Sequence, residues 1–372
     1  MKLQINSLLI LACIIGATAG CEDMNDKHRA YLEKGEIIYI GKIDSLHAFS
    51  GDERILFRYW ISDPRVKTLT VSWALEKESL EIDVPAHMPE DCFDVYIGKN
   101  EKSLAEGSHT FRWIANDNYG NRSIVFENGA NVYGQRYKSR LSNRPLLSAE
   151  AKGTDVTMTW GGMTDDDEVG VTVSYTSTTE AKVVRYCTSE DVASPVVFSD
   201  VKLTSPVTYQ TLYLPEPTAI DTFSTDPEKA SVQSSVNIVL NKPVTHSDAD
   251  PAANTGQMAV DGVTSGNATR WVSDNSNNEH WIEVDLQGSF AINAFRMWRD
   301  LSNATQHMKQ FRLQAWVDGA WIDVISEDNN EIAIYYKEFD SVTTDKVRLY
   351  VPPYQDNRTR VFEIEVYSIV RY

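Results

Sequence analysis

Short stretches in which apolar and polar residues alternate run through this chain, and they limit its fold more than any other feature. Examples are "TLTVSWAL" over 68–75, "DVTMTW" over 155–160 and "HWIEVDLQG" over 280–288. A period of two residues is typical of strands with one buried face. Between 36 and 372, no stretch of twelve or more residues carries a helical stripe. The sequence therefore predicts an all-β protein.

Turn-forming residues divide the predicted strands at near-regular spacing, which favours β-sandwiches. Proline-bearing joints lie at "SNRPLLS" over 142–148 and at the polar stretch 214–235. We predict two fibronectin- or immunoglobulin-like sandwiches and then a third, jelly-roll sandwich. The predicted parts are a signal peptide (1–20), a linker (21–33), module 1 (34–143), module 2 (144–222), a second linker (223–235) and module 3 (236–372).

Composition excludes two classes of protein. With 42% hydrophobic residues in 372, the chain can bury sizeable cores, so it is not disordered throughout. A formal net charge of −18 argues against a nucleic-acid partner, because binding to phosphate polyanions depends on clustered Lys and Arg.

The N-terminus reads as an export signal. Lys2 precedes the apolar run "LLILACIIG" over 8–16, and small residues then lead to Cys21. This order resembles the bacterial lipobox, which implies that Cys21 is acylated, although Thr18 stands where the family prefers Leu. The alternative is an ordinary signal peptide with a chance cysteine. The following "EDMND" resembles the surface-export signal of Bacteroidetes lipoproteins, so we expect a lipid anchor in the outer membrane, at the cell surface.

Two cysteines remain in the folded body, Cys92 and Cys187. A disulfide between them is permitted outside the cytoplasm. We predict two separate free thiols instead, because the two residues lie in different predicted modules.

We find no catalytic motif. The zinc-helix, nucleophile-elbow, phosphate-loop and dinucleotide patterns are all missing from the sequence, and the seven histidines lack ligand-type spacing. The acidic run "TDDDEVG" over 164–170 suits a solvated turn better than a cation loop, because adjacent aspartates on an extended chain point to opposite faces. We therefore predict that the protein is not an enzyme.

Module 3 carries five motifs in series, which are "NIVLNKPVTHSDAD", "MAVDG…ATRWVSD", "HWIEVDLQGSFAINAFRMWRD", "QFRLQAWVDGAWIDV" and "DKVRLYV…RVFEIEVYSI". Together they resemble a discoidin-type domain, also called the coagulation factor 5/8 type C domain, whose carbohydrate-binding members form a large family. In the third motif, Ile282, Val284 and Leu286 share one face. In the fourth, Phe311, Leu313, Ala315 and Val317 do the same, and Asp318-Gly319 predicts a hairpin turn.

The resemblance implies a structural cation site. The residues at matching positions are the Ala259 carbonyl, Asp261, Thr269 and Glu363. Thr264 is a rival to Thr269, and Glu365 is a rival to Glu363. Carboxylate, hydroxyl and carbonyl oxygens in a flexible loop suit Ca²⁺.

Ligand recognition in carbohydrate-binding relatives uses loops at one end of the sandwich, where an aromatic ring stacks on the apolar face of a sugar and polar side chains bind its hydroxyls. Three loops of this chain hold such residues. The candidates are His246, Trp298, Arg299, Asn303, His307, Tyr354, Asn357 and Arg358. Trp298 is an equally good candidate for the core, and we favour Arg299 and Tyr354 as contacts.

The sequence thus predicts a non-catalytic surface lipoprotein that binds glycans through module 3, in polysaccharide capture or utilisation, with an outer-membrane transporter complex as a possible partner. The region from Cys21 to about 222 resembles an uncharacterised family of Bacteroidetes surface lipoproteins, which implies a spacer. The alternatives are an adhesin or protein-binding module, because discoidin-type domains also bind proteins, and a glycoside hydrolase accessory subunit.

Overall fold

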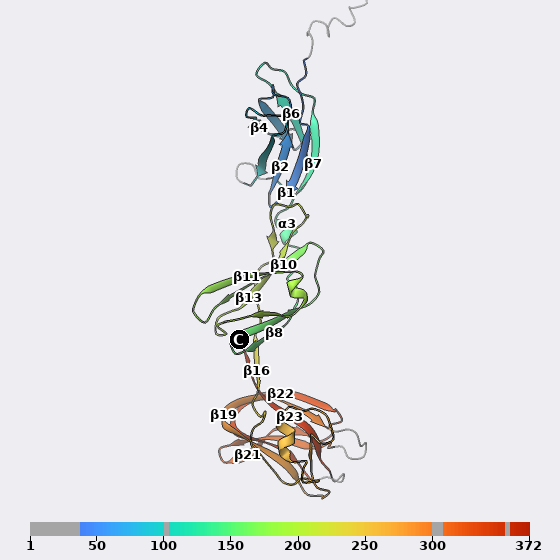
Figure 1. Ribbon diagram of the computed structural model, residues 1–372, viewed down its shortest axis with the longest axis vertical. Coiled ribbons are helices and arrows are strands. Elements are labelled where there is room, and N and C mark those ends of the chain that lie inside the picture. The colour runs from blue at the N-terminus through green and yellow to red at the C-terminus, as the bar shows by residue number, and fades with distance from the viewer. Residues whose placement is uncertain (1–37, 100–103, 300–307, 354–357) are drawn as a thin grey trace, which may run out of the picture. The chain divides into compact units, whose positions relative to one another are not determined.

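The computed structural model describes residues 38–99, 104–299, 308–353 and 358–372 (Figure 1). In these ranges nearly all regular structure is strand, and the one α-helix, α3, spans only Gln135–Lys138. The predicted all-β class is confirmed. No helix in the described ranges has the length and hydropathy needed to span a bilayer. The signal peptide, the linker 21–33 and Cys21 lie outside the described residues, as do Asn303, His307, Tyr354 and Asn357.

The first compact unit contains the described residues up to Leu141 together with Tyr213–Ser224. One of its sheets has β1 (Ser45–Ser50), β2 (Arg54–Trp60) and β5 (Cys92–Gly98); the other has β4 (Glu78–Asp83), β3 (Thr68–Trp73), β6 (Gly107–Asn116) and β7 (Phe126–Val132). Phe57 packs edge-on against Phe111 and Trp113 at centroid distances of 4.8 and 5.0 Å. Such aromatic pairs make the core of this sandwich.

The segment 213–224 belongs to the first unit through two acidic residues. Glu216 accepts hydrogen bonds from the Ser50 hydroxyl (2.9 Å) and the Tyr133 hydroxyl (3.0 Å). Asp221 accepts two from the Arg54 guanidinium, at 2.9 and 2.5 Å. The stretch read as the end of module 2 and the start of a linker therefore packs on module 1.

The second compact unit contains Ser142–Leu212 and Thr225–Tyr372. Its N-terminal part is a sandwich of β8 (Leu146–Lys152), β9 (Asp155–Trp160) and β12 (Val196–Phe198) over β10 (Glu168–Thr176), β11 (Lys182–Thr188), β13 (Thr208–Tyr213) and β15 (Glu228–Lys229). Val156, Met158 and Phe198 lie in its core. Cys187 is buried here and Cys92 lies in the first unit; both are free thiols, as predicted.

Strand β16 (Gln233–Asn237) continues this sandwich into the C-terminal part of the unit. It pairs in parallel with β8 and antiparallel with β23 (Arg360–Arg371). The predicted linker 223–235 is thus partly strand.

The C-terminal part is a sandwich made by two long, bent strands, β19 (His280–Arg299) and β22 (Ile334–Val351). Their pairing register shifts between Asp285 and Phe290, where Gln287 has a φ of 56°. The first half of β19 and the second half of β22 form the front sheet with β17 (Val244–His246), β20 (Phe311–Val317) and β21 (Ala320–Glu327). The other halves form the back sheet with β23 and β18 (Trp271–Val272).

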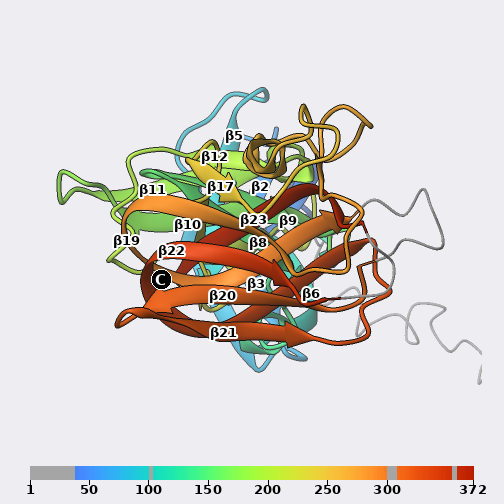
Figure 2. The same ribbon diagram turned by 90° about the horizontal axis from the view of Figure 1, so that it is seen from below.

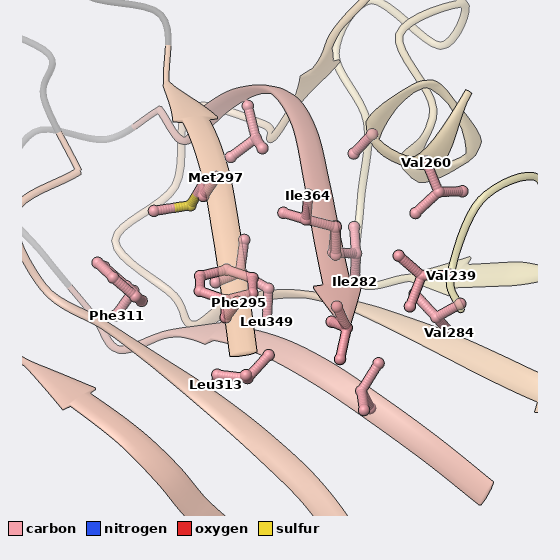
Figure 3. Close-up of a cluster of buried hydrophobic side chains, with 14 of the residues drawn as sticks. Val239, Val260, Ile282, Val284, Phe295, Met297, Phe311, Leu313, Leu349 and Ile364 are labelled. Carbon is pink, nitrogen blue, oxygen red and sulfur yellow. The ribbon is translucent and has the colours of Figure 1, made fainter. Parts of the chain in front are cut away.

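Side chains from both sheets meet in one core (Figure 3). Ile282, Val284, Leu286, Phe311, Leu313 and Ala315 are fully buried, as predicted from alternation, and Val317 packs partly buried against them. The predicted hairpin turn is also confirmed, because Val317 pairs with Ala320 and both Asp318 and Gly319 have positive φ.

Candidate functional site

A loop closes over one end of the back sheet and covers the carboxylate of Glu363. The loop follows the 3₁₀ turn η2 (Gly256–Val260) and runs to β18. Ala259 is fully buried, and Gly262, at a φ of 84°, directs its N–H onto Glu363 Oε1 at 3.1 Å. Glu363 itself has no exposed surface. Two of the predicted cation ligands, Asp261 and Glu363, are therefore neighbours.

The second oxygen of Glu363 is the unusual feature of this site. Oε2 is buried and has no hydrogen-bond partner among the described residues. Burial, together with the nearby negative charges of Asp261 and Glu365, raises the pKa of Glu363 to about 8. Burying a carboxylate without full compensation is costly. The site therefore calls for a proton or a cation at this oxygen.

The two alternative cation ligands, Glu365 and Thr264, have different surroundings. Glu365 is engaged by the Tyr367 hydroxyl and by Arg296, whose nitrogen lies 3.7 Å from Oε2. Thr264 is exposed. The Thr269 hydroxyl is within hydrogen-bonding distance of the carbonyls of Ser265 (2.6 Å) and Gly266 (2.9 Å), so it closes the loop. Of the two acids, Glu363 is the one with an oxygen, Oε2, that has no partner among the described residues.

Asn254 holds this loop, and no sequence pattern singled it out. Its buried side-chain amide donates to the carbonyls of Asn267 (3.2 Å) and Arg270 (2.9 Å). An Asn near glycines usually indicates only a turn. Its role depends on contacts 13 and 16 residues away, which no local pattern reveals.

The loop that follows β17 is organised by Asp248. Its carboxylate accepts hydrogen bonds from the Asp274 N–H (2.6 Å) and from His280 Nδ1 (2.9 Å). Asp248, Asp274 and His280 bring potential metal-ligand atoms within 4.8 Å of one another, but the Asp248 oxygens already accept these bonds. His246, a predicted ligand contact, is half-buried, and its Nδ1 has no partner among the described residues.

The structure contradicts our prediction for Arg299. This side chain is only 4% exposed, and its guanidinium donates to the carbonyls of Ile332 (2.9 Å from Nε), Asn330 (3.2 Å) and Met308. Its N–H groups donate to acceptors inside the protein, and these hydrogen bonds tie the end of β19 to the segment before β22. Arg299 therefore positions backbone and does not face a ligand.

Trp298 and Arg358 lie nearer to solvent. Trp298 is half-buried on the outer side of the back sheet, where the guanidinium of Arg296 lies 5.5 Å from its ring. Arg358 is paired with the carboxylate of Asp250. The structure thus keeps His246, Trp298 and Arg358 as partly accessible candidates.

The acidic run in module 2 is a turn, as predicted. Asp165 and Asp166 are exposed, whereas Glu168 is buried. Its carboxylate accepts hydrogen bonds from Arg144 (2.8 Å) and from the Thr164 N–H (3.1 Å).

Comparison with solved structures finds similar modules that span about a third of this chain. Chitosan-binding module 1 from a chitosanase/glucanase of Paenibacillus sp. IK-5 is 24% identical, covering 36% of this chain and 99% of the module, with a TM-score of 0.32. A Streptococcus pneumoniae fucose binding module is 20% identical (36% and 94% covered, TM-score 0.32). The lectin domain of lectinolysin, complexed with Lewis B antigen, is 17% identical (35% and 95% covered, TM-score 0.32). No curated protein matches.

Two family models match the sequence. Residues 21–223 match DUF4998, a domain of unknown function. Residues 258–349 match the NedA-like, galactose-binding domain of the F5/8 type C group. Because the first match spans more than half of the 372 residues, the chain belongs to the DUF4998 family, and its C-terminal part carries a galactose-binding-like F5/8 type C domain.

Proposed function

We propose that this protein is a non-catalytic glycan-binding protein and that its C-terminal sandwich carries the binding site. The observation that carries the proposal is the match of residues 258–349 to a galactose-binding domain. The names of the similar solved modules include chitosan, fucose or Lewis B antigen as the ligand, which agrees with a carbohydrate ligand.

The binding loops of this proposal lie at the end of the sandwich where β17 ends and β23 begins. His246 and Arg358 offer hydrogen-bonding groups there. The other predicted contacts, Asn303, His307, Tyr354 and Asn357, lie outside the described residues. A ring such as that of Tyr354 or Trp298 would stack on the apolar face of a sugar.

We propose Ca²⁺ as a structural ion of this domain. The Ala259 carbonyl, Asp261, Thr269 and Glu363 would hold it. Support comes from the buried, unpartnered Oε2 of Glu363 beside Asp261, because a hard cation prefers such oxygens. The ion would neutralise the two carboxylates and tie the loop to β23.

For the cell, we propose that Cys21 carries lipid and anchors the protein in the outer membrane, facing outward for polysaccharide capture with a transporter complex. The order of charged, apolar and small residues before Cys21 supports this. Labelling with a palmitate analogue should mark the wild type and not Cys21→Ala; equal labelling of both would remove the anchor from the proposal.

A glycan array probed with the mature protein tests the function itself. We expect binding to a restricted set of glycans, weakened by Tyr354→Ala and by His246→Ala more than either change weakens folding. Tyr119→Ala is the matched control, because this aromatic ring is 90% exposed on the first unit. Binding to no glycan, or release of reducing sugar that follows the protein through purification, would overturn the proposal.

A further inference from the structure

The outer face of the front sheet carries an unusual set of side chains. Strands β19, β22, β20 and β21 lie side by side in this sheet (Figure 2). Ile282, Leu313 and Leu349 point from it into the core. The residues that alternate with them face away from the core, and we call six of these the aromatic row: Trp281, Gln314, Trp316, Trp321, Arg348 and Tyr350.

Members of the row contact one another across the sheet. Trp316 and Trp321 are direct cross-strand partners with ring centroids 5.2 Å apart. The Arg348 guanidinium lies 4.5 Å from the Trp321 ring and 5.3 Å from the Tyr350 ring. Trp281 lies opposite Tyr350 in the register. The row therefore crosses four strands, a width of about 14 Å at ordinary strand spacing.

The hydrogen-bonding groups of the rings are not used within the protein. Among the described residues, the indole N–H groups of Trp281, Trp316 and Trp321 make no hydrogen bond, in contrast to that of Trp271, which donates to the Asp248 carbonyl at 3.0 Å. All four rings of the row are half-buried against their neighbours. The solvent side of an antiparallel sheet is usually polar. Three indoles within these four neighbouring strands therefore offer apolar area together with free donors.

Charges near the row are paired with one another. Arg348 donates to Gln314 Oε1 at 2.8 Å, and Gln314 in turn donates to Asp323 Oδ1 at 2.7 Å. Arg312 pairs with Asp328 at 2.6 Å, and Lys346 with Glu283 at 3.6 Å. With its charges compensated locally, this surface is poorly suited to a strongly charged ligand.

From these observations we infer that the aromatic row is a second glycan-binding surface, separate from the end loops, and that it takes an extended, neutral polysaccharide chain. Such a chain presents apolar C–H faces to rings and hydroxyls to free N–H donors, and it needs no opposing charge. A row that crosses four strands suits a chain better than a single sugar. The inference rests on the proposed glycan-binding function but uses different residues.

The test measures depletion of the mature protein by insoluble cellulose, chitin and starch. We expect the wild type to be retained on at least one of them, and the double variant Trp316→Ala/Trp321→Ala to bind it roughly tenfold more weakly, a loss of about 1.4 kcal/mol. Trp321→Phe should keep most of the binding because a ring remains. Tyr119→Ala should bind like the wild type, and its ring is on the first unit.

The outcomes separate this inference from the proposed function. If the double variant is retained like the wild type, or if the wild type binds soluble glycans on the array but no insoluble polysaccharide, the inference is overturned and the function stands. If the wild type binds no glycan in either assay, both fail. If the double variant does not fold, Trp281→Ala at the other end of the row decides by the same criterion. A dimer that these substitutions convert to monomer would assign the row to a second copy and overturn the inference.

Discussion

Two buried glutamates in the second unit differ in their partners. Glu168, in the N-terminal sandwich, is 4% exposed and accepts a hydrogen bond from the equally buried Arg144. Glu363, in the C-terminal sandwich, is fully buried, takes one backbone N–H on Oε1 and leaves Oε2 without a partner in the described part of the chain. The chain thus supplies a cation for the first carboxylate and none for the second.

This contrast shows which of the two carboxylates needs a partner from outside the chain. A buried ion pair offsets much of its desolvation cost through mutual attraction, whereas a lone buried charge has no such compensation. The first site is complete as built. By our proposal the second site is completed by Ca²⁺, which Glu363 and Asp261 would hold together.

Removing Arg144, the cation that pairs with Glu168, should have the largest effect. Arg144→Met leaves Glu168 buried and unpaired, so we expect a loss of about 3 to 5 kcal/mol in the free energy of unfolding of the second unit, measured with denaturant. The double variant Arg144→Met/Glu168→Leu should recover most of this loss, since no lone charge remains. Equal stability of the single and double variants would show that the pair is not the cause.

Removing the proposed Ca²⁺ should have the second-largest effect. Chelation of Ca²⁺ should lower the melting temperature measured by calorimetry, because an ion that binds only the native state stabilises it by about 2.7 kcal/mol at a hundredfold excess over its dissociation constant. Glu363→Gln should abolish the response to chelator, whereas Glu365→Gln, which changes the acid already held by Tyr367 and Arg296, should keep it. A chelator response that survives in Glu363→Gln would place the ion elsewhere.

The third prediction concerns Arg299, a buried cation whose partners are carbonyls and not a carboxylate. Arg299→Met removes the donor to three carbonyls, so we expect a loss of about 2 kcal/mol in unfolding free energy. Protein that remains folded should keep its glycan affinity and its response to Ca²⁺. A loss of affinity without loss of stability would restore Arg299 as a ligand contact.

The smallest effect is expected at a partly exposed pair in the first unit. Hydrogen bonds from Arg54 hold the pKa of Asp221 below its ordinary value of 3.8. The pair therefore stabilises the folded state above that pH, and the stabilisation is lost as pH falls through the lower, folded pKa. Asp221→Asn should cost about 1 kcal/mol at pH 7 and less under strong acid, as measured by denaturant titrations at several pH values. A cost independent of pH would mean that packing, and not charge, is lost.

The local pattern was enough to predict strands and their faces. Alternation placed Ile282, Val284 and Leu286 on one buried face, and Asp318-Gly319 specified a two-residue turn, because both features depend on residues a few positions apart. The proximity of Asp261 and Glu363 was predicted through a family resemblance, since no short-range rule relates residues about a hundred positions apart.

The local sequence specifies which side chains share a face of a strand, whereas only the folded chain specifies which groups each face contacts. Arg299 was predicted to contact the ligand, yet the carbonyls of Met308, Asn330 and Ile332 accept its hydrogen bonds. The polar stretch 214–235 was predicted to be a joint, yet Glu216 and Asp221 fix its first part to the first unit. Trp281, Trp316 and Trp321 form a row only because β19, β22, β20 and β21 pair in this order in one sheet. Period-two alternation carries no information about such partners, because register and loop closure depend on contacts between distant parts of the chain.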